Sequence, residues 1–149
     1  MNSRRMLVDE LKKYFSIKEL VCDHVYEKYG ERAWMLFDVM ALRLLLVLRR
    51  DILKVPMVCN TATMKQRGLR CNMCEIVKEK TSAYVSAHVT GKGFDFSSPA
   101  MSAEEMRLKI SECVDLLPCK VRIEQGVNWL HIDVYDEMTK ERIRYFKAS

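Results

Sequence analysis

The sequence predicts an α+β fold in which N-terminal helices pack on one face of a small, largely antiparallel sheet. Apolar residues recur at helical spacing through the first third of the chain, whereas apolar–polar alternation begins only in the C-terminal third. No repeat, low-complexity tract or Gly/Ser-rich linker divides the chain. We therefore expect a single domain over 1–149, helical over about 1–53 and sheet-bearing over about 54–149.

Three helices are expected before residue 53. Ser3 can cap the first, whose apolar residues follow the helical period. Ser16-Ile17-Lys18-Glu19 has the S-x-x-E pattern of a capping box, and the helix that it opens can end at Gly30. Residues 31–52 predict one long, mostly apolar helix against which the rest of the chain packs.

The second part of the chain alternates short regular segments with loops. Up to residue 116 we expect a buried strand at Met57–Cys59, a loop over 60–70, a short helix over 71–79, a polar loop over 81–92, and a helix from the Ser102 capping box to about Leu116. After Pro118 we expect strands at Cys119–Glu124, Trp129–Tyr135 and Arg142–Phe146, with a turn over 125–128 between the first two.

The composition is that of a globular chain, with 49% hydrophobic and 30% charged residues. The net charge is +5, but basic and acidic residues are interleaved, so we expect no nucleic-acid partner. The most apolar stretch, 33–48, contains Asp38 and Arg43, which argues against membrane insertion. No secretory signal is visible near the N-terminus, so we expect synthesis in a cytoplasm, where the six cysteines would be reduced and mostly buried.

Side-chain alternation places several polar residues on one face of the expected sheet. In the Trp129–Tyr135 strand, His131 alternates with apolar residues and therefore points away from the core. Asp95 lies between two phenylalanines and therefore also points away from the core. Arg122 and Glu124, in the expected Cys119–Glu124 strand, point the same way. If these strands share one sheet, the four side chains emerge from its open face, where we expect a functional site.

Histidine usage suggests that this site holds a metal. Of the three histidines, His88 and His131 lie next to this face, and Asp95 adds a carboxylate. Two imidazoles and one carboxylate suit a catalytic zinc ion with an open fourth position. On spacing alone the alternative stays open that these are ordinary hydrogen-bonded histidines.

Two motifs resemble a known family. Residues 86–95, SAHVTGKGFD, fit S-x-H-x-x-G-x-x-x-D, and residues 129–133, WLHID, fit W-x-H-x-D. Over about residues 15–135 the chain is similar to the zinc D-Ala-D-Ala carboxypeptidase and endolysin family, whose fold is shared with the hedgehog signalling domain.

The resemblance implies one zinc ion per chain, held by His88, Asp95 and His131. It implies hydrolysis of a peptide bond in peptidoglycan stem or cross-link peptides. Small members without a leader are often phage-encoded, which implies action at the bacterial cell wall or in a virion.

Two positions depart from the family pattern. The arginine that helps members to hold substrate is replaced by Met64, and Arg67 and Arg70 are the nearest substitutes. The acid that several members carry three residues before the last histidine is replaced by Asn128, an amide that cannot serve as a general base. We therefore assign the role of general base to Glu124, at the end of the preceding strand.

Three further residues are expected around the zinc ligands. Asp133 would orient a ligand imidazole, Trp129 would wall the cleft, and Ser86 belongs to the first motif. Simple structural roles for Asp133 and Trp129 stay open.

Two other functions are considered. Asn128 and Met64 favour a catalytically inactive zinc-binding domain used for structure or wall recognition, for example in a phage particle. Cys71-Asn72-Met73-Cys74 has the C-x-x-C spacing of redox or structural zinc sites, but no second pair accompanies it, and buried small residues are the simpler interpretation.

Overall fold

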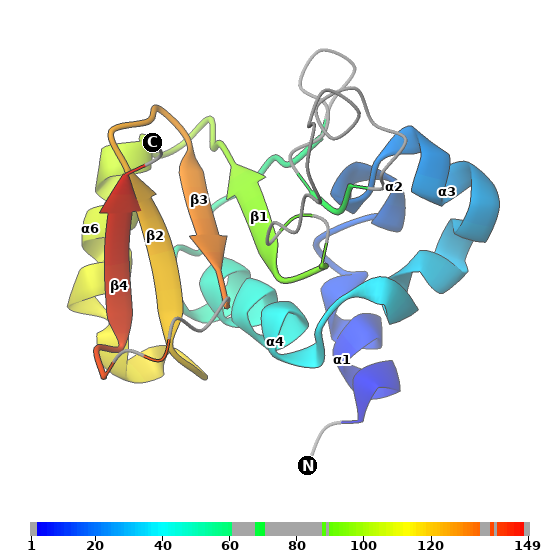
Figure 1. The fold of residues 1–149 in the computed structure, drawn as a ribbon, viewed down its shortest axis with the longest axis horizontal. Helices are drawn as coiled ribbons and strands as arrows, with labels where there is room; N and C mark the ends of the chain where they lie inside the picture. The colour runs from blue at the N-terminus through cyan, green and yellow to red at the C-terminus, as the bar shows by residue number, and fades with distance from the viewer. Residues whose placement is uncertain are drawn as a thin grey trace.

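The computed structural model describes residues 3–60, 68–70, 88, 90–134, 138 and 140–147. These residues form an α+β fold, with N-terminal helices followed by a four-stranded mixed sheet (Figure 1). The predicted 71–79 helix and most of the 81–92 loop lie outside the described residues, as do Met64, Arg67, Ser86 and the Cys71/Cys74 pair.

The N-terminal caps form as predicted. Helix α1 (Arg4–Leu11) begins at Ser3, whose hydroxyl accepts from the N–H of Met6, and α2 (Ile17–Leu20) begins with the Ser16/Glu19 capping box. The helix expected from there to Gly30 is divided, because Val21 takes an extended conformation and bridges Leu69. Helix α3 (Asp23–Tyr29) then ends at Gly30, which has a φ of 54°.

The single long helix predicted over 31–52 is wrong. This segment contains the 3₁₀ helix η1 (Gly30–Leu36), α4 (Val39–Val47) and the π-helical turn η2 (Leu48–Ile52). Asp38 causes the division: its carboxylate caps α4 by accepting from the N–H groups of Met40 and Ala41, while its own backbone is not helical. Arg4 stabilises the break by donating to the carbonyl of Phe37 at 2.7 Å.

The four strands are β1 (Gly93–Phe96), β2 (Val121–Gln125), β3 (Leu130–Asp133) and β4 (Ile143–Lys147), in the order β1-β3-β2-β4. Strand β3 is antiparallel to both neighbours, as expected, but β4 is parallel to β2, so the sheet is mixed. The strand predicted at Met57–Cys59 is reduced to one bridge, between Val58 and Ser97, although Met57 and Cys59 are buried as expected.

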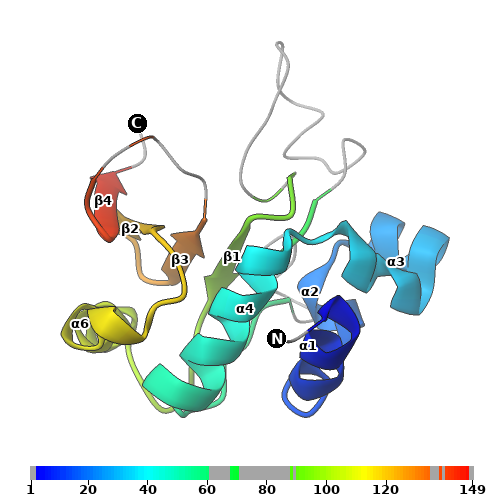
Figure 2. The ribbon, with the colours of Figure 1, turned by 90° about the horizontal axis from the view of Figure 1, so that it is seen from below.

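Helices cover one face of this sheet. Helix α6 (Ala103–Glu112), followed by the 3₁₀ turn η3 (Val114–Leu116), starts at the predicted Ser102 capping box. Figure 2 shows α6 below β2 and β3, and α4 below β1. The buried apolar side chains of the strands face these helices, and they are Phe94, Phe96, Val121, Ile123, Leu130 and Ile132.

The four cysteines in the described ranges are present as thiols. Cys22 and Cys59 are buried, and partial burial raises the pKa of the Cys119 thiol to about 11. Within the same ranges, no helix combines the length and apolarity that a bilayer crossing requires.

Phe94 anchors β1 to the core, since its ring lies 5.4 Å from that of Phe37 and 5.5 Å from that of Phe96. Phe94→Ala should lower the free energy of unfolding by about 3–5 kcal/mol through lost burial and a residual cavity. Urea titration monitored by circular dichroism measures this loss. Leu108→Ala, at a position 60% exposed on α6, is the control and should change stability by about 0.5 kcal/mol or less. Equal losses for the two variants would contradict this packing.

Candidate metal centre

Polar side chains form a row across the sheet on the face opposite the helices. Asp95 on β1 pairs with His131 on β3. The β2–β3 register pairs Arg122 with Asp133, and Glu124, two residues after Arg122 on β2, lies on the same face. Glu124 in turn pairs with Phe146 on β4. This row confirms the predicted alternation, because Asp95, His131 and Glu124 come from three strands to one face.

His88 reaches the row from the segment before β1. The chain turns at Gly91, whose φ is 70° and whose carbonyl accepts from the N–H of Asp38 at 3.0 Å. A Cβ at Gly91 would lie 2.6 Å from the carbonyl oxygen of Leu36, so the close approach to η1 requires glycine. This turn holds His88 against β1, where it is 5% exposed.

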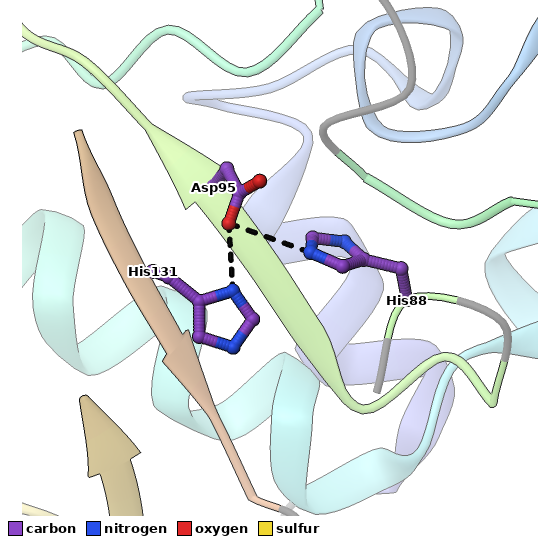
Figure 3. A group of neighbouring side chains, drawn as sticks. All are labelled: His88, Asp95 and His131. Atoms are coloured by element: carbon purple, nitrogen blue, oxygen red, sulfur yellow. Dashed lines mark hydrogen bonds and ion pairs between the residues drawn. The ribbon is translucent and has the colours of Figure 1, made fainter. Parts of the chain in front are cut away.

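The three predicted ligands converge as expected (Figure 3). His131 Nδ1 lies 2.7 Å and His88 Nε2 lies 3.4 Å from the same oxygen, Asp95 Oδ1. One ligand atom from each residue lies within 4.8 Å of the other two, and all three residues are buried. This group could hold a metal ion.

Each imidazole has a hydrogen-bond acceptor at its outer nitrogen, the ring nitrogen that points away from Asp95. His88 Nδ1 is 3.1 Å from the carbonyl oxygen of Gly68, and His131 Nε2 is 2.7 Å from Asp133 Oδ2. Both partners can only accept, so the outer nitrogens carry the protons. A metal ion would replace the proton that His131 Nδ1 donates to Asp95 Oδ1 at 2.7 Å, while the outer N–H keeps the ring oriented, which is the usual arrangement of histidine ligands.

The electrostatics of the group favour positive charge beside Asp95, whether a proton on an imidazole or a metal ion. Burial opposes charge on His131, but hydrogen bonds to Asp133 and Asp95 outweigh it and raise the pKa of His131 to about 9. Burial likewise acts against the charge of Asp95, yet hydrogen bonds from His131 and His88 hold the pKa of Asp95 well below its usual range. A site that stabilises a positive charge between these donors fits zinc, for which two imidazoles and a carboxylate are common ligands.

Two residues that received no role from the sequence lie around the ligand group: Phe146 contacts His131 directly, and Arg122 is linked to His131 through Asp133. Arg122 donates to both carboxylate oxygens of Asp133, at 2.9 Å each. Phe146 lies edge-on to His131 with ring centroids 5.7 Å apart, and the Arg122 guanidinium lies 4.5 Å from the Phe146 ring centroid. Alternation indicated the face of Arg122, but nothing in the sequence indicated that β4 pairs with β2 and brings Phe146 here.

The other predicted site residues occupy varied positions. Glu124 is buried in the row, and Asp133 contacts His131 as expected. Arg70 is buried, and its backbone N–H donates to the carbonyl of His88 at 3.2 Å. Trp129 is half-buried just before β3, and its indole Nε1 has no hydrogen-bond partner within the described ranges. Asn128, in the β2–β3 turn, is exposed.

Comparisons of this chain with protein-family models, with curated proteins and with solved structures return no match. The resemblance to zinc carboxypeptidases and endolysins therefore remains a prediction from two motifs.

The geometry predicts one zinc ion per chain, lost on removal of a ligand. His88→Ala and His131→Ala should each abolish stoichiometric zinc, because the two remaining donors cannot form the three-residue site. Elemental analysis after gel filtration measures the content. His24→Ala, at the third histidine, which is exposed on α3, is the matched control and should keep the metal. Zinc retained by all three variants would mean that the ion lies elsewhere.

Proposed function

We propose that the chain is a zinc-dependent peptidase that hydrolyses a peptide bond in bacterial peptidoglycan stem or cross-link peptides. The observation that carries this proposal is the buried group of His88, Asp95 and His131, whose imidazoles are each oriented by an outer acceptor. The order and spacing of the two motifs supply the substrate class through their resemblance to wall-lytic peptidases.

His88 Nε2, Asp95 Oδ1 and His131 Nδ1 would hold the zinc ion, since these are the atoms that face one another. A zinc ion with three protein ligands supplies an acidic water and a Lewis acid for the scissile carbonyl. The burial of all three ligands limits competing solvent and strengthens the electrostatic interactions of the site.

Glu124 would be the general base and acid. Its side chain lies on the same face of the sheet as His131, on the adjacent strand, and Glu124 is paired with Phe146, whose ring contacts His131. In this role Glu124 accepts a proton from the attacking water and later delivers it to the leaving amine. The exposed amide of Asn128 has no proton-accepting capacity at neutral pH and takes no part in this transfer.

Arg70 would bind a carboxylate of the substrate. Its backbone is hydrogen-bonded to that of His88, which ties the two residues together. Arg122 is less suited to this role, because its fork already holds both oxygens of Asp133. Arg67, which lies outside the described residues, remains the second candidate for substrate binding.

A zinc-binding but inactive domain, used for structure or wall recognition in a phage particle, is the second candidate. The exposed amide of Asn128, at the position where several members of the family carry their acid, favours it. Incubating the zinc-loaded protein with muropeptides, with and without a chelator, separates the two functions. A zinc-loaded protein that leaves muropeptides intact would favour the inactive domain.

Glu124→Gln should keep one zinc per chain and lower muropeptide hydrolysis by about 10²–10⁴-fold, the usual contribution of general acid–base catalysis. Chromatography of the products together with elemental analysis measures both properties. Glu141→Gln, at an exposed glutamate before β4, makes the same chemical change outside the row and should leave hydrolysis intact. Full activity in Glu124→Gln would require another base.

A further inference from the structure

We propose that Arg122, supported by Phe146, is a positioning residue that orients the metal ligand His131 through Asp133. This inference rests on the metal centre of the proposed function, and it assigns a role to the last strand of the sheet. Neither Arg122 nor Phe146 belongs to the three-residue ligand group.

The three residues Arg122, Asp133 and His131 form a continuous chain of contacts. Arg122 Nε and Nη2 donate to Asp133 Oδ1 and Oδ2, at 2.9 Å each. Asp133 Oδ2 also lies 2.7 Å from His131 Nε2, so one oxygen is shared by the guanidinium and the imidazole. Asp133 is fully buried, and its orientation therefore depends on these partners.

The bidentate geometry matters because a carboxylate turns easily about its terminal torsion. Two parallel hydrogen bonds from one planar guanidinium fix the plane of the Asp133 carboxylate. That plane keeps Oδ2 at His131 Nε2, and the opposite ring nitrogen, Nδ1, then faces Asp95 Oδ1. A lysine at position 122 could make only a point contact and would fix the plane less well.

Phe146 contacts both ends of this chain of contacts. Its ring lies 4.5 Å from the Arg122 guanidinium carbon and is perpendicular to the His131 ring at 5.7 Å. The parallel pairing of β4 with β2 brings Phe146 to the row. Strand β4 thus contacts the ligand His131 on β3, although the two strands are not paired with each other.

The direction of the change in metal affinity distinguishes a positioning role of Arg122 from a purely electrostatic effect of its charge. Removing a positive charge near a cation site would by itself strengthen metal binding. Loss of an orienting partner weakens it, by about 10–100-fold for residues in contact with metal ligands. A weaker site in an Arg122 variant would therefore indicate lost orientation.

The test measures zinc and cobalt affinity by competition with a chromophoric chelator, together with the visible spectrum of the cobalt-loaded protein. Arg122→Met should bind both metals more weakly, by up to the about 10–100-fold expected for loss of Asp133 itself, with an altered cobalt spectrum. Arg122→Lys should be intermediate in affinity. Arg144→Met, at the β4 position paired with Arg122, removes the same charge and should not weaken binding.

A double-mutant cycle tests whether Arg122 acts through Asp133. In a protein that already carries Asp133→Asn, Arg122→Met should cause little further loss of affinity. Phe146→Leu, which removes the aromatic ring but keeps an apolar side chain, should weaken metal binding several-fold. It is the alternative test if Arg122→Met does not fold.

Unchanged or tighter binding by Arg122→Met, or an equal loss in the Asp133→Asn background, would overturn the positioning role while leaving the metal centre intact. A wild-type protein that binds neither metal would overturn both proposals.

Discussion

The site depends on one buried carboxylate oxygen, Asp95 Oδ1, that faces two imidazoles at 2.7 and 3.4 Å. A buried carboxylate is costly unless positive charge or donors surround it. The outer nitrogens of both rings already have acceptors, in Gly68 and Asp133, so Asp95 requires positive charge on the inner side of the group, either a proton on His131 Nδ1 or a metal ion. The remaining features of the site follow from satisfying this requirement inside a small fold.

The sheet meets this requirement because a strand separates its side chains onto two faces. On β1, Phe94 and Phe96 pack into the aromatic core while Asp95 points to the other side. Strand β1 therefore contributes both to the hydrophobic core and to the metal site, and a change in the packing of its phenylalanines would move Asp95. The helices supply the rigid support, with η1 pressed against the turn at Gly91 that carries His88 to the sheet.

Local patterns predicted much of this arrangement. The capping residues Ser3, Ser16 and Ser102 start their helices, and alternation placed Asp95 and His131 on one face, because these features depend on neighbours in sequence. Asp38 was missed as a helix cap because a polar residue within an apolar run gives little sign of a break. Other features depend on pairing between distant segments. Alternation does not specify which strands are partners, so the parallel pairing of β4 and the position of Phe146 were not predicted. The contact of His88 with the Gly68 carbonyl was not predicted either, because a backbone acceptor leaves no pattern in the side chains.

The most direct test of the central claim is X-ray absorption at the zinc edge of the purified protein. We expect a first shell of nitrogen and oxygen at about 2.0–2.2 Å, with the outer-shell scattering of two imidazoles. A shell containing sulfur at about 2.3 Å would assign the metal to cysteines, and the absence of zinc from a protein reconstituted with the ion would exclude a zinc site at His88, Asp95 and His131.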